Sequence, residues 1–276
     1  MRNESLLDPV YQFDGPSDAW HWRKTANLVR HLAWRHLALR YRGSKLGFIW
    51  SLLNPVFLMA VYTFVFTFVF QTKLEGIPYH VFFFTGILAW NLVNVGSMAA
   101  AVSLVDGSSL IKKVAFPRFV LPFSAVVSSA ANYVITLPIL LGFNLLFGVR
   151  PTWSILLLPF ALVLLMLMGL GTGLLLAAVV PRFRDLQHLI EVLFAAWFFM
   201  TPVLYPATQV TSSVSHRVSI LYGLNPMVGV MELIHYVFFG QNVPGWTLAA
   251  AIVTITLLFF LGMWVFQRLV ADVSEL

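Results

Sequence analysis

Two ionisable residues stand in an otherwise apolar part of the chain and share a helical face. Glu232 and His235 lie three positions apart between residues 205 and 246, so a helix there places both side chains on one side. If this stretch is embedded in a membrane, each group costs roughly 3 kcal/mol and has some reason to be there, and one interpretation is that both line a path. Two alternatives stay open: the side chains pair with each other, or they pair with His216 and Arg217.

Nucleotide chemistry is not expected from this chain alone. A phosphate-binding loop needs a glycine-rich turn that ends in Lys-Ser or Lys-Thr, and no such pattern occurs in the 276 residues. The glycines of MGLGTG resemble a dinucleotide loop only superficially, because they lie within an apolar run and follow no strand. The spacing of Gly169 and Gly173 is typical of close helix packing in a membrane.

No catalytic or metal-ligating set is predicted either. The chain has no cysteine, which excludes disulfides and thiolate metal sites. Asp106, Asp185 and Glu191 fall at the ends of apolar runs, where we interpret them as interfacial charges. An enzyme that acts within the membrane would need a convergent polar cluster, and the sequence shows none.

The amino-acid composition is typical of an integral membrane protein. Hydrophobic residues make up 59% of the chain and charged residues 10%, against roughly 45–50% apolar residues in soluble domains, and the mean hydropathy is +0.85. The N-terminal residues lack the basic-then-apolar layout of a cleaved signal peptide, so we expect them to be retained. The sequence therefore predicts one membrane domain.

Six apolar stretches are long enough to be read as transmembrane helices. We expect spans at residues 48–70, 79–105, 119–147, 155–180, 189–204 and 247–266. The fold class is then an all-α integral membrane protein. We divide the chain into a cytoplasmic N-terminal segment (1–46), a transmembrane domain (47–268) and a cytoplasmic tail (269–276).

The stretch from residue 205 to 246 breaks the regular pattern. Its apolar pieces are about half a membrane thick, and such pieces are more often re-entrant or interfacial than spanning. Pro202, Pro206 and Pro226 interrupt helices there. We expect two short helices that dip back from the extracytoplasmic side, between the fifth and sixth spans. A fully external loop is the alternative.

Basic residues predict the orientation. The N-terminal segment, the second-to-third and fourth-to-fifth loops and the tail hold 14 of the 17 Lys and Arg residues, and the opposite loops hold 3. Cytoplasmic loops carry such an excess, so both termini should be cytoplasmic. The net charge of +6 does not indicate nucleic-acid binding, because the basic residues concentrate before the first span.

Residues 22–39 form an amphipathic pattern. Leu28, Val29, Leu32, Ala33 and Leu37 fall on one half of a helical wheel, with His36 among them, and Lys24, Arg30, His31 and Arg35 fall on the other. This pattern is typical of a helix in the membrane interface, with its apolar face in the acyl boundary and its basic face toward anionic headgroups. A soluble helix packed on a partner is the alternative.

The spans are rich in aromatic residues and nearly free of acidic ones, which argues against ion-coupled transport. Most of these aromatic side chains should face lipid or pack between helices. A minority that lined a conduit would suit sugar rings, whose apolar faces stack on aromatic rings.

Four segments stand out in the sequence: RYRGSKLGFIWSLLNP (40–55), LIKKVAFPRFVLP (110–122), TPVLYP (201–206) and LNPM (224–227) followed by Glu232. These segments resemble permease subunits of type-2 family ABC exporters, above all those that export O-antigen polysaccharides and teichoic acids. The four segments occur in order and cover nearly the whole chain.

The resemblance implies a homodimer in the bacterial inner membrane, with two copies of a separate ATPase that binds ATP and Mg²⁺. This chain would then carry no cofactor and would not be an enzyme. The implied substrate is an undecaprenyl-linked polysaccharide, most simply the O-antigen of lipopolysaccharide. Capsular polysaccharide or teichoic acid is the alternative within the class, and an intramembrane enzyme of lipid-linked sugars is the alternative outside it.

The resemblance also assigns roles to residues. A coupling helix that docks on the ATPase would consist of Ser108, Ser109, Leu110, Ile111, Lys112, Lys113, Val114 and Phe116, with Leu110 and Ile111 as apolar anchors. An ordinary basic loop is the alternative. The lipid headgroup would meet Arg40, Arg42 and Lys45. Channel and gate positions would be Tyr62, Phe66, Phe70, Trp197, Tyr205, Asn225, Pro226, Glu232 and His235. His235 departs from the arginine of many such permeases, and a histidine is charged only part of the time at neutral pH.

Overall fold

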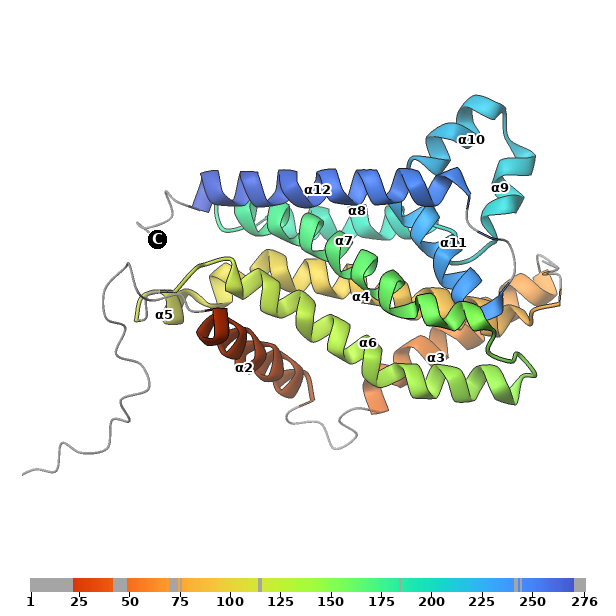
Figure 1. Cartoon of the computed structure of the whole chain (residues 1–276), viewed down its shortest axis with the longest axis horizontal. Coiled ribbons are helices and arrows are strands. Elements are labelled where there is room, and N and C mark those ends of the chain that lie inside the picture. The colour runs from red at the N-terminus through yellow and green to blue at the C-terminus, as the bar shows by residue number, and fades with distance from the viewer. Residues whose placement is uncertain are drawn as a thin grey trace, which may run out of the picture.

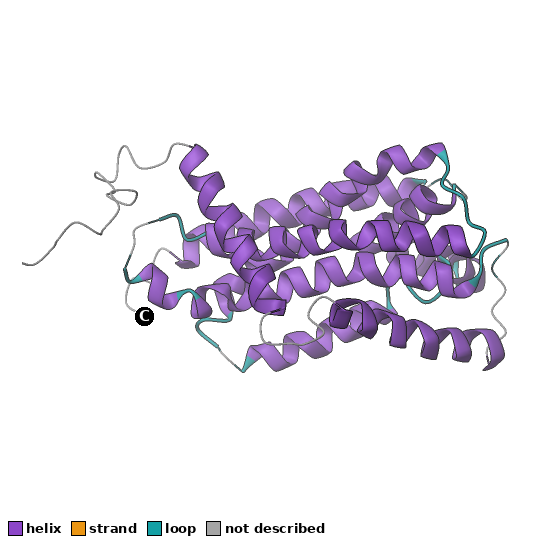
Figure 2. Ribbon diagram, turned by 90° about the horizontal axis from the view of Figure 1, so that it is seen from below, coloured by secondary structure: helices purple, strands orange, loops and turns teal. Residues whose placement is uncertain are grey.

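All regular structure in the described part of the chain is helical (Figures 1 and 2). A computed structural model describes residues 22–41, 49–69, 74, 76–113, 116–183, 185–240, 243 and 245–270. The helices are α2 (Trp22–Tyr41), α3 (Ile49–Phe64), η2 (Val65–Val69), α4 (Tyr79–Asp106), α5 (Ser108–Ile111), α6 (Val120–Leu146), η3 (Trp153–Leu157), α7 (Leu158–Val179), α8 (Leu186–Phe199), α9 (Ala207–Ser213), α10 (His216–Gly223), α11 (Pro226–Phe239) and α12 (Trp246–Val270). The predicted all-α class is confirmed.

Four helical segments are long and apolar enough to cross a membrane: α4, α6, η3 with α7, and α12. They correspond to the second, third, fourth and sixth predicted spans. Taken together, α10 and α11 are also long and apolar enough for one span, but the helix axis bends by 79° at the short break between them. The described residues therefore support four or five spans.

The first predicted span (48–70) agrees with the consecutive helices α3 and η2, which cover residues 49–69, although their apolar part is given only by Val56–Val69. The fifth predicted span is shorter than expected, because its apolar helix is Leu186–Phe199 and a span needs about 20 residues. We predicted that the fifth span reaches Leu204, and this boundary is wrong: α8 ends at Phe199. Pro202 disfavours the helical conformation of the residue before it, which agrees with the irregular backbone after α8. The count of six stays a prediction.

Helix α4 lies at the centre of the bundle and α12 at its edge. α4 has buried residues on every side and contacts α3, α6, α7, α8 and α11. α12 buries only a stripe that includes Thr247, Ala251 and Ile255, and its outer face exposes Leu257, Phe260 and Leu261. A continuous apolar outer face is suited to bilayer lipid rather than water.

The glycines of MGLGTG lie inside α7 and allow close helix packing, as predicted. A Cβ on Gly173 would lie 2.7 Å from the Cβ of Ala100 on α4, and one on Gly169 would lie 3.4 Å from Val126 on α6. On the other side of α7, a Cβ on Gly262 of α12 would lie 2.5 Å from the carbonyl oxygen of Gly171. The contacts at Gly173 and Gly262 are too close for any larger residue, so these two glycines set the helix spacing, whereas the distance at Gly169 is an ordinary van der Waals contact.

The predicted amphipathic helix is present as α2, but its apolar face contacts protein. Val29, Leu32, Ala33 and Leu37 are buried, and α2 packs on α6. In this structure α2 packs on α6 and part of its apolar face lines an open groove beside α6, so the expectation that this face meets the acyl boundary stays a prediction. His36 is half-buried, in agreement with its predicted place among the apolar residues.

The two ends of the bundle differ. α5 and the C-terminal end of α12 lie at one end, and α9 and α10 lie at the other (Figure 1). Trp246 and Trp264, both more than half exposed, are 18 residues apart in α12, a rise of about 27 Å. This rise is close to the roughly 30 Å hydrocarbon thickness of a bilayer, and tryptophan favours both interfaces. The predicted boundary at residue 46 falls outside the described residues, as do residues 271–276 of the tail.

Candidate functional site

Asn225 joins the end of α8 to the start of α11. Its side-chain oxygen accepts hydrogen bonds from the backbone N–H of Met227 (3.1 Å) and from the indole N–H of Trp197 (3.0 Å). Its amide donates to the carbonyl of Met200 (3.1 Å). Asn225 is the N-cap of α11 and Pro226 follows at the first helical position, an arrangement that favours helix initiation. Three of the predicted gate residues thus form one junction.

The rest of α11 is held by α12 and η3. Thr247 of α12 donates a hydrogen bond to the Glu232 carboxylate, and Ser154 of η3 donates to the carbonyl of Val237 (3.0 Å). The closest approach is at Gly229, where a Cβ would lie 2.3 Å from the carbonyl oxygen of Thr247. The helix ends at Gly240, which has a positive φ of 66°, as is usual for a glycine that follows a helix.

Glu232 and His235 contact different helices. The imidazole of His235 stacks on Phe82 of α4, with ring centroids 4.0 Å apart, and its Nε2 is buried without a hydrogen-bond partner. Glu232 is bound by Thr247 on the other side. The structure therefore places the two predicted residues in separate contacts, and it does not show the side-chain pairing that the sequence left open.

Aromatic residues of α3, η2, α4 and α8 form one group. Tyr62 contacts Phe83 (centroids 4.9 Å apart), and Phe66 stacks on Tyr79 (5.2 Å). Trp197 meets Trp90 edge-on at 5.5 Å. Tyr62, Phe66 and Trp197 are half-buried, so each packs on α4 and keeps part of its surface accessible. Phe70 lies outside the described residues.

The segment between α8 and α12 contains three short helices, where two were expected. The Tyr205 hydroxyl donates to the carbonyl of Phe199 (2.6 Å), which folds the chain back on the end of α8. Pro206 then precedes α9. α9 and α10 are mostly exposed, whereas α11 is mostly buried.

The predicted coupling segment is a short helix at the end of the bundle opposite α9 and α10 (Figure 1). Ser108, Ser109, Lys112 and Lys113 are exposed. Leu110 and Ile111 are half-buried against a second core cluster, which is built from α2, α4, α6, α7 and α12.

Phe116 belongs to this second core cluster and is only 9% exposed. Its predicted place on the docking surface is therefore wrong in this structure, because its side chain points into the bundle. Val114, Arg42 and Lys45 lie outside the described residues, and Arg40 lies in α2.

Two arginines from different loops bind the C-terminal end of α12, and sequence reasoning missed them. Arg118 donates to the carbonyl of Val270 (2.5 Å), and Arg182 donates to that of Leu269 (3.2 Å). Cationic side chains near the last carbonyls of a helix are stabilising, because they donate hydrogen bonds to these carbonyls and because the helix dipole is negative there. The sequence signal was present as basic loops, but it does not reveal a partner about 150 residues away.

Metal binding has no support in the described part of the chain, where no group of three or more His, Asp and Glu side chains is close enough to hold an ion. The described residues instead form junctions between helices, which aromatic contacts and side-chain hydrogen bonds hold together.

Comparison with known proteins gives consistent matches. A model of the ABC-2 type transporter family matches residues 27–239. An O-antigen export system permease protein of Myxococcus xanthus is 38% identical over 241 residues, which are 87% of this chain and 86% of that protein. One such protein of Klebsiella pneumoniae is 24% identical over 246 residues (88% of this chain, 92% of that protein), and another is 27% identical over 185 residues (66% and 70%).

Proposed function

Because the chain belongs to the ABC-2 type transporter family, we propose that it is the membrane subunit of an ATP-driven exporter of lipid-linked O-antigen. The observation that carries this proposal is the 38% identity to an O-antigen export permease over 86% of that protein's length. The matched family region runs from α2 to the end of α11, so it includes the coupling segment and the Asn225 junction.

The chain would be a multi-pass protein of the bacterial inner membrane. In the topology that we propose, six segments cross, α10 and α11 form a re-entrant pair, and both termini are cytoplasmic. The charge excess of 14 to 3 supports the orientation. α5 and the C-terminal end of α12 also lie together at one end of the bundle, as this topology requires (Figure 1).

The partners would be two copies of an ABC ATPase, which bind ATP and Mg²⁺, and a second copy of this chain. The exposed polar residues of α5 suit contact with the ATPase. The second copy would pack on the apolar surfaces that α3 and α8 leave open, which include Phe57, Val61, Leu189, Val192 and Leu193.

Movement of α5 would reach the bundle through the second core cluster. Leu110 and Ile111 pack on this cluster, and Phe116 belongs to it together with Val120 of α6 and Phe266 of α12. Packed interiors transmit displacement, so a push by the ATPase would shift α6 and α12 rather than bend a loose loop. At the other end, the Asn225 junction would open a path for sugar along the aromatic group.

Gene deletion in the source bacterium tests this function. We expect O-antigen to disappear from the cell surface while its undecaprenyl-linked form accumulates inside, and a plasmid copy should restore export. Loss of capsule or teichoic acid with normal O-antigen would transfer the assignment to that polymer. Purified chain that chemically modified the lipid-linked sugar without ATP or a partner would contradict the transporter assignment.

A further inference from the structure

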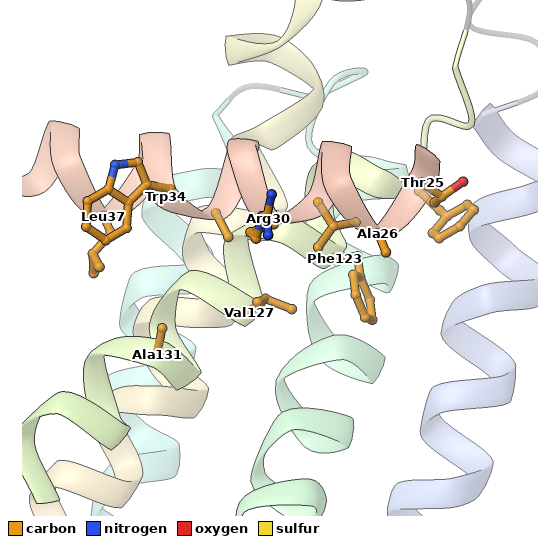
Figure 3. A pocket seen from close by; sticks show the side chains of 11 residues that line it. Thr25, Ala26, Arg30, Trp34, Leu37, Phe123, Val127 and Ala131 are labelled. Atoms are coloured by element: carbon orange, nitrogen blue, oxygen red, sulfur yellow. The ribbon is translucent and has the colours of Figure 1, made fainter. Parts of the chain in front are cut away.

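An apolar groove runs between α2 and α6, apart from the Asn225 junction and from α5. Its volume is about 670 Å³, within the roughly 300–1,000 Å³ typical of small-molecule sites. Eleven residues line it: Thr25, Ala26, Val29, Arg30, Ala33, Trp34, Leu37, Phe119, Phe123, Val127 and Ala131. Figure 3 shows the labelled α2 side chains in a row above Phe123, Val127 and Ala131, with Arg30 near the middle.

The groove has the length of one membrane leaflet. Phe119, Phe123, Val127 and Ala131 recur every fourth residue, so they form one stripe along α6. From Phe119 to Ala131 the helix rises roughly 18 Å, which is near the roughly 15 Å of hydrocarbon in half a bilayer. α6 is itself a candidate span, and the four side chains are half-buried, so the accessible part of each can contact an acyl chain that enters the groove.

Among the described residues that line the groove, Arg30 is the only charged one. It is exposed on α2, and an exposed guanidinium beside an apolar groove can bind a phosphate with charge-assisted hydrogen bonds. The groove begins at Phe119, next to Arg118 and the α12 end that Arg118 and Arg182 bind. Basic residues gather at the cytoplasmic surface of a membrane, where anionic lipids are enriched.

From these observations we propose that the groove binds one anionic phospholipid, with an acyl chain along the α6 stripe and the phosphate on Arg30. An undecaprenyl chain is much longer than one leaflet and fits the groove's length poorly. The bound lipid would hold α2 against α6. This site requires only that α6 lies in the bilayer and does not depend on the exported polymer.

Native mass spectrometry of the full-length purified chain tests the site, with phosphatidylglycerol and phosphatidylcholine of identical acyl chains as probes. We expect one phosphatidylglycerol per chain, bound about fivefold more tightly than phosphatidylcholine, because one arginine near an anionic lipid contributes roughly 1 kcal/mol. Arg30→Gln should remove this preference. Arg35→Gln, a change at an exposed arginine that does not line the groove, should keep it.

A groove-filling variant tests the acyl-chain contact separately. Ala26→Phe places a ring in the groove from an exposed position and should weaken the binding of both lipids. Ala38→Phe, at an exposed α2 residue away from the groove, should not. Equal binding of the two lipids to the unmodified chain, or unchanged binding to Ala26→Phe, would overturn the proposal. So would tighter binding of undecaprenyl diphosphate than of phosphatidylglycerol, which would make the groove a substrate site.

Discussion

Asn225 satisfies three hydrogen-bonding groups with one side chain: the N–H of Met227, the indole of Trp197 and the carbonyl of Met200. Loss of a helix cap alone costs about 1 kcal/mol, and an unpaired indole N–H adds about 1–3 kcal/mol. We therefore expect Asn225→Ala to lower the free energy of unfolding by at least about 2 kcal/mol, measured by denaturation in detergent. Gln209→Ala, at an exposed residue of α9, should change it little. Equal stability of the two variants would show that the junction is not anchored by Asn225.

Gly229 sets the distance between α11 and α12. A methyl group there would lie 2.3 Å from the carbonyl oxygen of Thr247, so Gly229→Ala forces the helices apart and should destabilise the protein by about 1–3 kcal/mol. Gly142→Ala is the matched control, because a methyl group at Gly142 in α6 meets no atom within 4 Å. In a helix this second change should be neutral or stabilising by up to about 1 kcal/mol. A Gly229→Ala protein as stable as the Gly142→Ala protein would contradict the close contact.

His36 makes the stability of the α2 region depend on pH. Burial lowers the pKa of His36 from its ordinary value of 6.5, the positive charge of Arg35 lowers it further, and Asp106 partly opposes both. The folded protein then favours the neutral imidazole, so the unfolded chain binds the proton first as the pH falls. The stabilisation is complete above about pH 6.5 and is lost progressively as the pH drops toward the folded-state pKa.

Unfolding midpoints at pH 7.5 and 5.0 measure this effect. His36→Gln cannot titrate, so its midpoint should fall less between the two pH values than that of the unmodified chain. His31→Gln, at an exposed residue of the same helix, should behave like the unmodified chain. If His36→Gln retained the full pH dependence, another group would have to account for it.

At the scale of elements, the C-terminal end of α12 is held by two loops that are distant in sequence. Arg118 donates to the carbonyl of Val270, and a cation at this position also opposes the negative end of the helix dipole. Arg118→Ala should therefore let the last turns of α12 fray, at a cost of about 1 kcal/mol. Hydrogen exchange measured by mass spectrometry should rise in residues 262–270 and stay constant in α4. Arg217→Ala, on exposed α10, is the control. Equal hydrogen-exchange protection of residues 262–270 in both variants would show that Arg118 does not stabilise the end of α12.

The elements differ in how well the sequence predicted them. The expected span at 79–105 agrees with α4 (Tyr79–Asp106), and that at 119–147 agrees with α6 (Val120–Leu146), because long apolar runs between polar turns define a helix locally. α8 was misplaced because its apolar run continues past Phe199, while the helix does not. The division of residues 207–239 into three helices also depends on local capping and packing that hydropathy does not record.

The sequence identified several residues of the candidate site but not the contacts that these residues make. Asn225 and Pro226 were identified through the resemblance to type-2 exporters, and the structure shows them as the N-cap and the first residue of α11. The contact of Asn225 with Trp197 and that of Glu232 with Thr247 depend on how α8, α11 and α12 pack against one another. No local sequence pattern records this packing. For the same reason Phe116, which follows exposed Lys112 and Lys113, was expected on a docking surface but lies in the second core cluster.

At the scale of the whole molecule, the position of α9 decides between two topologies. If α8 crosses the membrane and α10 with α11 is re-entrant, α9 lies on the side opposite α5. If α8 does not cross and α10 with α11 forms one bent span, α9 lies on the same side as α5. Both topologies place Val243, between α11 and α12, on the side opposite α5. In the structure, α9 and α5 lie at opposite ends of the bundle (Figure 1).

Labelling of single cysteines can measure this difference, because the natural chain has no cysteine. Ser109→Cys in α5, Gln209→Cys in α9 and Val243→Cys all place the thiol at an exposed residue. With a membrane-impermeant maleimide applied from the periplasmic side, we expect Gln209→Cys and Val243→Cys to be labelled and Ser109→Cys to react only after the membrane is opened. Protection of Gln209→Cys together with labelling of Val243→Cys would show that α8 does not cross. A 14-residue helix such as α8 can reach both surfaces only where the bilayer thins or the helix extends, so labelling at residue 209 would also locate such a distortion.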